Sequence, residues 1–203
     1  MITVYCVPDL EIALDRFKND YGIEAIIGGR HLDQGTKNAI VSLGQSVYLE
    51  LLAIDKSSSK NIEHHWMGID YLTSPKITRW AIVSDQINED LKTIAAYKTD
   101  LAKSHQGSRV MTNGGLLSWQ MSLPSYRPEV ELMPFLLNWS ESDHHPTEQL
   151  RQQAKIIAFD LYHPAPNDLQ TYFEQLDLDI KIQAGTSSMI SLTLEGPKGR
   201  LTL

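Results

Sequence analysis

One carboxylate, Glu50, stands among apolar residues in the strand-like segment "VYLELLA" at residues 47–53. A carboxylate in a half-buried wall can accept a hydrogen bond from a ligand, and burial can tune a carboxyl group to act as a general base. The nearby segment "GGRH" adds Arg30 and His31, and a guanidinium can clamp a carboxylate or phosphate group. Glu50 is therefore the first candidate for catalysis, with Arg30 and His31 as candidate ligand-binding residues or ordinary loop residues.

The direction of the Glu50 side chain follows from the alternation of side chains along two neighbouring strands. A turn centred on Gly44 pairs the segment before it with the segment that holds Glu50, and places the mixed polar rows on one face of the sheet. We predict that this face points away from the helix, and that Asn38 on it contacts a ligand or fixes the loop. The predicted pairs in this row are Ser42 with Tyr48, Ile40 with Glu50, and Asn38 with Leu52.

The elements that carry these residues form a repeated unit. The order strand, helix and three strands is predicted for residues 1–55 and again for residues 78–139. A third, shorter unit with the same order is predicted for residues 155–203. Polar linkers at 56–77 and 140–154 separate the three units.

Three such units in succession resemble the vicinal-oxygen-chelate superfamily, which includes glyoxalases, extradiol dioxygenases and bleomycin-resistance proteins. The segments "VPDL", "GGRHLDQGTKNAIVSLG", "YLELLA", "WAIVSD" and "PFLLNW" resemble, more narrowly, the glyoxalase-like domain family of bacteria. The resemblance covers about residues 2–183. It implies an α+β fold in which repeated βαβββ units form curved mixed sheets, with the helices on the convex side.

The resemblance also implies where a divalent metal would be held in metal-dependent relatives, and this chain departs from that pattern. The carboxylate position is Glu50, but the histidine position near the start of the first strand is Ile2, and the second histidine position is Lys37. The equivalent positions in the other units are Thr78, Ala158, Pro134 and Thr202. Because a tightly held metal needs three or four protein ligands, we expect no metal and no other cofactor.

The same alternation predicts which face of the sheet other side chains occupy. Trp80 is predicted on the concave face, where an indole floors a pocket or packs between units. Arg109 is a candidate ligand-binding residue, and both Arg30 and Arg109 are candidate structural partners of Glu50. Trp119 is predicted to face the helices, and Trp139 to seal a sheet edge. The row predicted to face the cavity on the same strand as Trp119 is Ser118, Gln120 and Ser122.

Composition narrows the class of protein. Hydrophobic residues make up 42% and charged residues 21% of the 203 residues, which is typical of a globular protein. The net charge of −7 argues against a nucleic-acid or anionic-membrane partner, since both need a basic surface. The strand-like start of the chain and its single cysteine, Cys6, favour a cytoplasmic location. Cys6 is predicted to be a core residue, and the paired histidines of "EHHW" and "SDHH" solvated linker.

The sequence thus predicts a glyoxalase-like protein that binds a small organic molecule at a degenerate, metal-free site in a concave cavity. Two alternatives remain: a metal-dependent lyase, isomerase or dioxygenase of the same superfamily, and a resistance-type protein that sequesters a ligand without catalysis. Two units normally pair in this fold, so the third either caps the pair or joins a partner chain in a homodimer. The predicted ligand-binding residues are Arg30, His31, Asn38, Tyr48, Glu50, Trp80 and Arg109.

Overall fold

The computed structural model describes residues 1–110, 116–140, 147 and 150–203. Its element order repeats the pattern strand, helix and three strands three times, which confirms the predicted α+β fold of βαβββ units. The first unit consists of β1 (Ile2–Cys6), α1 (Leu10–Tyr21), β2 (Ile26–His31), β3 (Thr36–Gly44) and β4 (Val47–Ile54).

The second and third units follow the same order with short additions. A 3₁₀ helix, η1 (Trp66–Tyr71), precedes the second unit. The second unit consists of β5 (Lys76–Val83), α2 (Ile87–Tyr97), the 3₁₀ helix η2 (Thr99–Ala102), β6 (Ser104–Val110), β7 (Leu116–Ser122) and β8 (Phe135–Asn138). The third unit consists of β9 (Lys155–His163), α3 (Asn167–Gln175), β10 (Ile182–Ala184), β11 (Met189–Gly196) and β12 (Gly199–Thr202).

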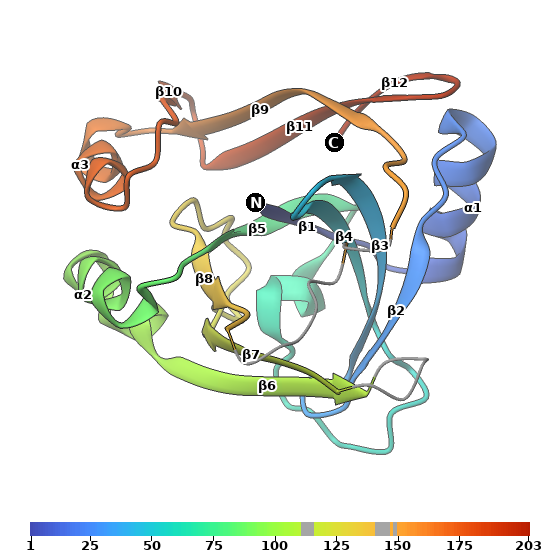
Figure 1. Ribbon diagram of the computed structural model, residues 1–203, viewed down its shortest axis with the longest axis horizontal. Helices are drawn as coiled ribbons and strands as arrows, with labels where there is room; N and C mark the ends of the chain where they lie inside the picture. Colours follow the sequence, from blue (N-terminus) through green and yellow to red (C-terminus); the bar gives the residue numbers. More distant parts are fainter. Residues whose placement is uncertain (111–115, 141–146, 148–149) are drawn as a thin grey trace.

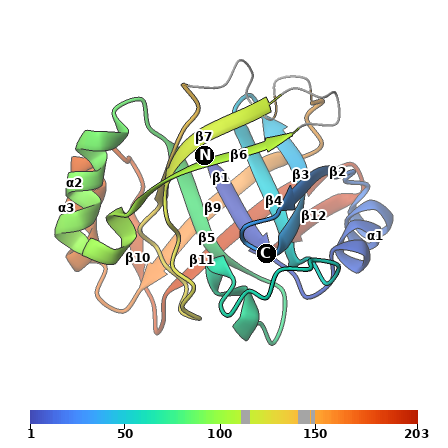
Figure 2. The ribbon, with the colours of Figure 1, turned by 90° about the horizontal axis from the view of Figure 1, so that it is seen from below.

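The first two units share one mixed eight-stranded sheet of order β2-β3-β4-β1-β5-β8-β7-β6. The units are joined by antiparallel pairing of β1 with β5. The sheet curls so that β6 and β7 lie opposite β1, β4 and β5, as Figure 2 shows from below. Among the helices in the described ranges, none is long and apolar enough to cross a lipid bilayer.

The register of the β3–β4 hairpin agrees with the sequence prediction. Ser42 lies opposite Tyr48, Ile40 opposite Glu50, and Asn38 opposite Leu52. A bulge beside the turn sets Gly44, and not Leu43 as predicted, opposite Val47. The alternation beyond the bulge is unaffected, so the mixed polar row keeps its predicted face.

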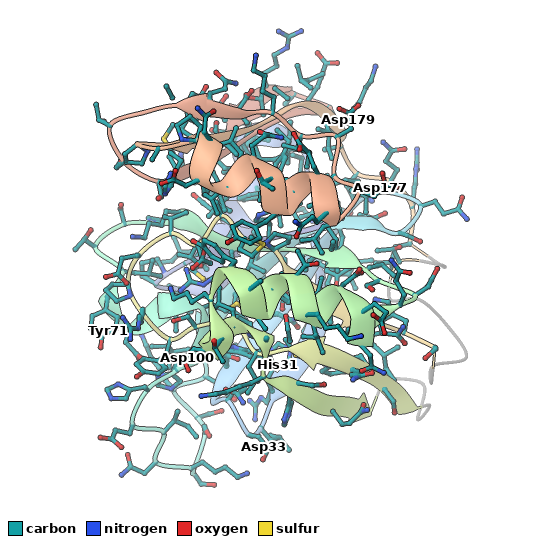
Figure 3. The ribbon with its side chains drawn as sticks, turned by 90° about the vertical axis from the view of Figure 1, so that its left-hand side faces the viewer. His31, Asp33, Tyr71, Asp100, Asp177 and Asp179 are labelled. Atoms are coloured by element: carbon teal, nitrogen blue, oxygen red, sulfur yellow. The ribbon has the colours of Figure 1, made fainter. Side chains whose placement is uncertain are left out.

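The third unit covers the convex face of the large sheet. Its four strands form a separate sheet of order β10-β9-β11-β12, which lies above β1 and β5 in Figure 1, with α3 at one end and α1 beside the other. Figure 3 shows α2 and α3 stacked on one side of the molecule. Buried residues of the third unit, such as Leu192 and Phe173, share one hydrophobic cluster with Leu49 and Leu51 of β4. The third unit therefore caps the pair formed by the first two.

Trp80 anchors this contact, so its predicted position on the concave face is wrong. Its ring is 1% exposed and lies 5.2 Å from Phe159 and 6.0 Å from Phe173, both in the third unit. The cause is a bulge in the β1–β5 pairing, where Arg79 lies opposite Val4 but Ile77 opposite Tyr5. The extra residue shifts the alternation by one position, which turns Trp80 to the convex side.

Removal of the Phe173 ring should loosen this contact between the two sheets. We expect Phe173→Ala to lower the free energy of unfolding by about 3–5 kcal/mol, because it leaves a cavity in a fully buried position. Urea denaturation followed by tryptophan fluorescence measures the change. The control Met189→Ala, on a side chain that is 47% exposed, should cost no more than about 0.5 kcal/mol. Equal losses in the two variants would contradict this packing.

Candidate functional site

The concave face of the eight-stranded sheet encloses a cavity of about 50 Å³. The polar side chains in its wall come from the first unit, namely His31 of β2, Asn38 of β3, and Tyr48 and Glu50 of β4. Four of the predicted ligand-binding residues are therefore brought together by the fold. Figure 3 shows His31 below α2, far from the third unit, whose Asp177 and Asp179 lie at the opposite end.

Glu50 and Asn38 form a buried polar pair in this wall. The Asn38 side-chain amide donates a hydrogen bond of 2.6 Å to Glu50 Oε1, from the adjacent strand. Both residues are at most 9% exposed. The other polar atom of Asn38, the carbonyl oxygen Oδ1, is buried and has no hydrogen-bond partner in the described part of the chain. Such an acceptor is costly, because it has lost water without replacement.

His31 lies at another point of the same wall, with two contacts that hold its ring. Its Nδ1 is 3.0 Å from the hydroxyl of Thr36, and the same hydroxyl accepts a hydrogen bond of 3.1 Å from the Trp66 indole. The His31 and Trp66 rings pack edge to face at 5.2 Å. The strand β2 is thereby tied to the segment that precedes the second unit.

That segment, η1, closes one side of the cavity with Trp66 and Met67. The sequence predicted a polar linker with room for a short helix here, and solvated residues at "EHHW", but Trp66 is 8% and Met67 is 2% exposed. Met67 has a left-handed backbone with φ of 62°, which a side chain adopts only when its surroundings hold it. His65 stabilises the turn through a contact of 2.6 Å between its ring and Asp70. A large aromatic residue within a polar linker is the signal that could have revealed this segment.

The second unit supplies an apolar wall, which corrects two face assignments. Leu117, Trp119 and Met121 line the cavity, whereas Gln120 points outward and bonds to Ser104. Helix α2 packs against β8, and the outward side chains of β7 that the structure describes are polar, namely Ser118, Gln120 and Ser122.

Trp119 needs a glycine on the neighbouring strand, because a Cβ at Gly107 would lie 2.5 Å from the indole. The Trp119 ring also packs 5.6 Å from Trp139, which lines the cavity as well and does not seal an edge. Two indoles from the second unit therefore form one end of the cavity.

The arginines predicted near Glu50 have different positions. Arg30 lies opposite Lys37 on the other face of the strand from His31, and its Nε is 3.2 Å from Asp55. Its guanidinium therefore faces away from the cavity rim that the sequence predicted. Arg109 belongs to β6, but its side chain falls outside the described residues, as does the "SDHH" segment.

The donors around Glu50 do not make up a metal site in the described ranges. The strand beside Glu50 presents Ile2, Val4 and Cys6 to the same cluster, all fully buried. Burial raises the pKa of the Cys6 thiol to about 12, so that it stays protonated near neutral pH. Within the described part, no group of three or more histidine, cysteine, aspartate or glutamate side chains could hold a metal ion.

The Glu50–Asn38 pair can be tested through stability. We expect Asn38→Leu to lower the free energy of unfolding by about 1–3 kcal/mol, because buried Glu50 loses a hydrogen-bond donor. Urea denaturation measures the effect. The matched control is Asn61→Leu on the exposed surface, which should change stability by about 0.5 kcal/mol or less. An Asn38→Leu protein as stable as the parent would contradict the pair's importance.

Comparisons with known proteins agree with this fold. A hypothetical protein from Staphylococcus aureus has a crystal structure that matches with a TM-score of 0.65 at 18% identity, over 93% of this chain and 86% of that one. At that identity the likeness shows the fold alone.

Two further solved structures match over a smaller part of this chain. Methylmalonyl-CoA epimerase from Streptomyces coelicolor matches with a TM-score of 0.41 at 14% identity, over 68% of this chain and 92% of that one. The epimerase from Mycobacterium tuberculosis matches with a TM-score of 0.39 at 15% identity, over 68% and 83%. No curated protein matches the chain.

The family is shown by a model of the whole domain. The model described as a glyoxalase-like domain matches residues 3–176, which include the first two units except Ile2 of β1, together with β9 and all of α3. This range contains every residue of the cavity wall named above. The chain belongs to the glyoxalase-like domain family.

Proposed function

We propose that this protein binds a small organic molecule in the concave cavity, and that the molecule donates a hydrogen bond to Asn38 Oδ1. The observation that carries the proposal is this buried carbonyl oxygen, which belongs to a residue of the cavity wall and lacks a partner in the described part of the chain. An unsatisfied buried acceptor costs about 1–3 kcal/mol, and a ligand hydroxyl or N–H group would remove that cost.

The rest of the wall defines the body of the ligand. Trp66, Trp119, Trp139 and Phe135 present aromatic rings, which favour a flat apolar or aromatic group. Glu50 is the one carboxylate among the described lining residues, so it is the group that would take part in any proton transfer. We propose that binding needs no divalent metal, since Ile2 and Lys37 occupy the two histidine positions of metal-dependent relatives.

We propose that a ligand enters the cavity by movement of η1. The cavity volume of about 50 Å³ is well below the roughly 300 Å³ at which ligand pockets begin. Trp66 and Met67 fill the space between the two halves of the sheet, on a segment with strained backbone at Met67. We propose that the ligand displaces this segment, because the strands of the wall are fixed by their ladders.

A pair of ring compounds of similar size tests the role of Asn38. Phenol should bind about fivefold more tightly than toluene, because its hydroxyl donates a hydrogen bond to Asn38 Oδ1. The factor corresponds to the net free energy of one neutral hydrogen bond, about 1 kcal/mol. Two-dimensional NMR of the indole N–H signals measures both affinities. The signals of Trp119 and Trp139 should shift, whereas Trp80 is an internal control because its indole donates to Leu132 at 2.6 Å on the other face.

Three results would contradict the proposal. Toluene that binds as tightly as phenol would leave no role for the Asn38 acceptor. Shifts confined to Trp80 would place the ligand outside the cavity. Binding of phenol that is lost in the presence of EDTA would overturn the metal-free proposal.

Truncation of the Trp66 side chain on η1 tests the access route. Trp66→Ala should increase the affinity for 2-naphthol relative to phenol by about tenfold, because it opens space for the second ring. The same NMR titration gives the ratio of the two affinities. The control Tyr71→Ala changes an exposed residue of η1 that does not line the cavity, and should leave the ratio unchanged. A ratio that is unchanged in Trp66→Ala would show that this side chain does not limit ligand size.

A further inference from the structure

A second hollow lies on the convex side of the large sheet, and the sheet separates it from the cavity. It is a groove of about 210 Å³ between α1, the end of β1 and the last strand, β12. Figures 1 and 2 both show α1 beside β12 at the junction of the first and third units. Most of its wall is apolar, including Val7, Phe17, Leu201 and Leu203.

Tyr5 brings a hydroxyl group into this apolar wall. The residue is only 7% exposed, and its hydroxyl has no hydrogen-bond partner in the described part of the chain. The hydroxyl oxygen is not fully enclosed by protein, so it reaches the open space of the groove. Burial raises the pKa of Tyr5 and keeps the phenol protonated, as a hydrogen-bond donor. The hydroxyl is therefore a donor that stands open to an acceptor bound in the groove.

Arg16 supplies a positive charge at the same groove. Its side chain is 55% exposed, and the carboxylate that pairs with it, Asp20, is 3.9 Å away on the next turn of the helix. The positive charge of Arg16 also opposes the rise in the pKa of Tyr5. A ligand anion between them would receive a charge-assisted hydrogen bond from Arg16 and a second bond from Tyr5.

The charges of Asp9 and Arg16 make the two ends of the groove electrostatically different. Asp9 also lines it, at the start of α1, where its carboxylate accepts a hydrogen bond of 3.1 Å from the backbone of Ile12. Asp9 and Arg16 are seven residues apart, which is about 10 Å along a helix. A negative group is therefore favoured at the Arg16 end and disfavoured at the Asp9 end.

We propose that this groove is a second ligand site that binds an aliphatic carboxylate. The carboxylate accepts hydrogen bonds from Arg16 and the Tyr5 hydroxyl, and the alkyl chain packs against Val7, Phe17 and Leu201. The site is independent of the proposed cavity ligand, because the groove and the cavity share no lining residue among those described.

Octanoate is the probe for this site, measured by isothermal titration calorimetry. Octanoate should bind saturably, and Arg16→Gln should weaken it about tenfold through the loss of a charge-assisted bond. Tyr5→Phe should weaken it about threefold, and octanol and octylamine should bind more weakly than octanoate. The control Arg200→Gln removes an equal charge from β12, where the side chain pairs with Glu195 at 3.4 Å, and should leave binding unchanged.

Several results would overturn the proposal. One is the absence of saturable octanoate binding, and another is equal binding to the parent and Arg16→Gln, a surface change that the fold tolerates. Equal losses in Arg16→Gln and Arg200→Gln would show a general charge effect. Binding that Glu50→Gln weakens and Arg16→Gln does not would assign the carboxylate to the concave cavity. The phenol titration of the cavity is unaffected by these results, so failure of one site is separable from failure of the other.

Discussion

The antiparallel pairing of β1 with β5 is the contact on which the rest of the molecule depends. It stands at the centre of the strand order, so neither half of the large sheet can enclose the cavity without the other. Its single bulge also turns Trp80 to the convex face, where the indole meets two phenylalanines of the third unit. One irregularity in one strand pair therefore links the cavity to the attachment of the third unit.

A buried guanidinium supports the second half of the sheet beside this bulge. Arg79 is 2% exposed and donates hydrogen bonds to the carbonyl oxygens of Thr78, Ser125, Arg127 and Glu129, at distances from 2.7 to 3.0 Å. Burial lowers the pKa of Arg79, and these bonds offset the loss of water around the charge. The loop they hold leads into β8, which brings Phe135 and Leu137 to the cavity.

The two faces of the sheet offer different chemistry to ligands. The concave face combines aromatic rings with the buried Glu50–Asn38 pair. The groove on the convex face has an apolar floor and a half-exposed cation, Arg16. That groove is formed where the third unit lays β12 beside α1.

The sequence by itself determined the repeated βαβββ units, the register of the β3–β4 hairpin and the direction of Glu50. These features depend on local alternation and on short turns, which are written into neighbouring residues. Tertiary structure alone decided the faces of Trp80 and Trp119. A bulge reverses the alternation at Trp80, and the row of Trp119 turns inward, where the wall of the cavity buries its apolar side chains. Tertiary structure also decided the positions of Arg30 and Trp66. Arg30 pairs with Asp55, and Trp66 donates a hydrogen bond to Thr36. Each contact joins residues at least 25 positions apart, which only the folded chain brings together.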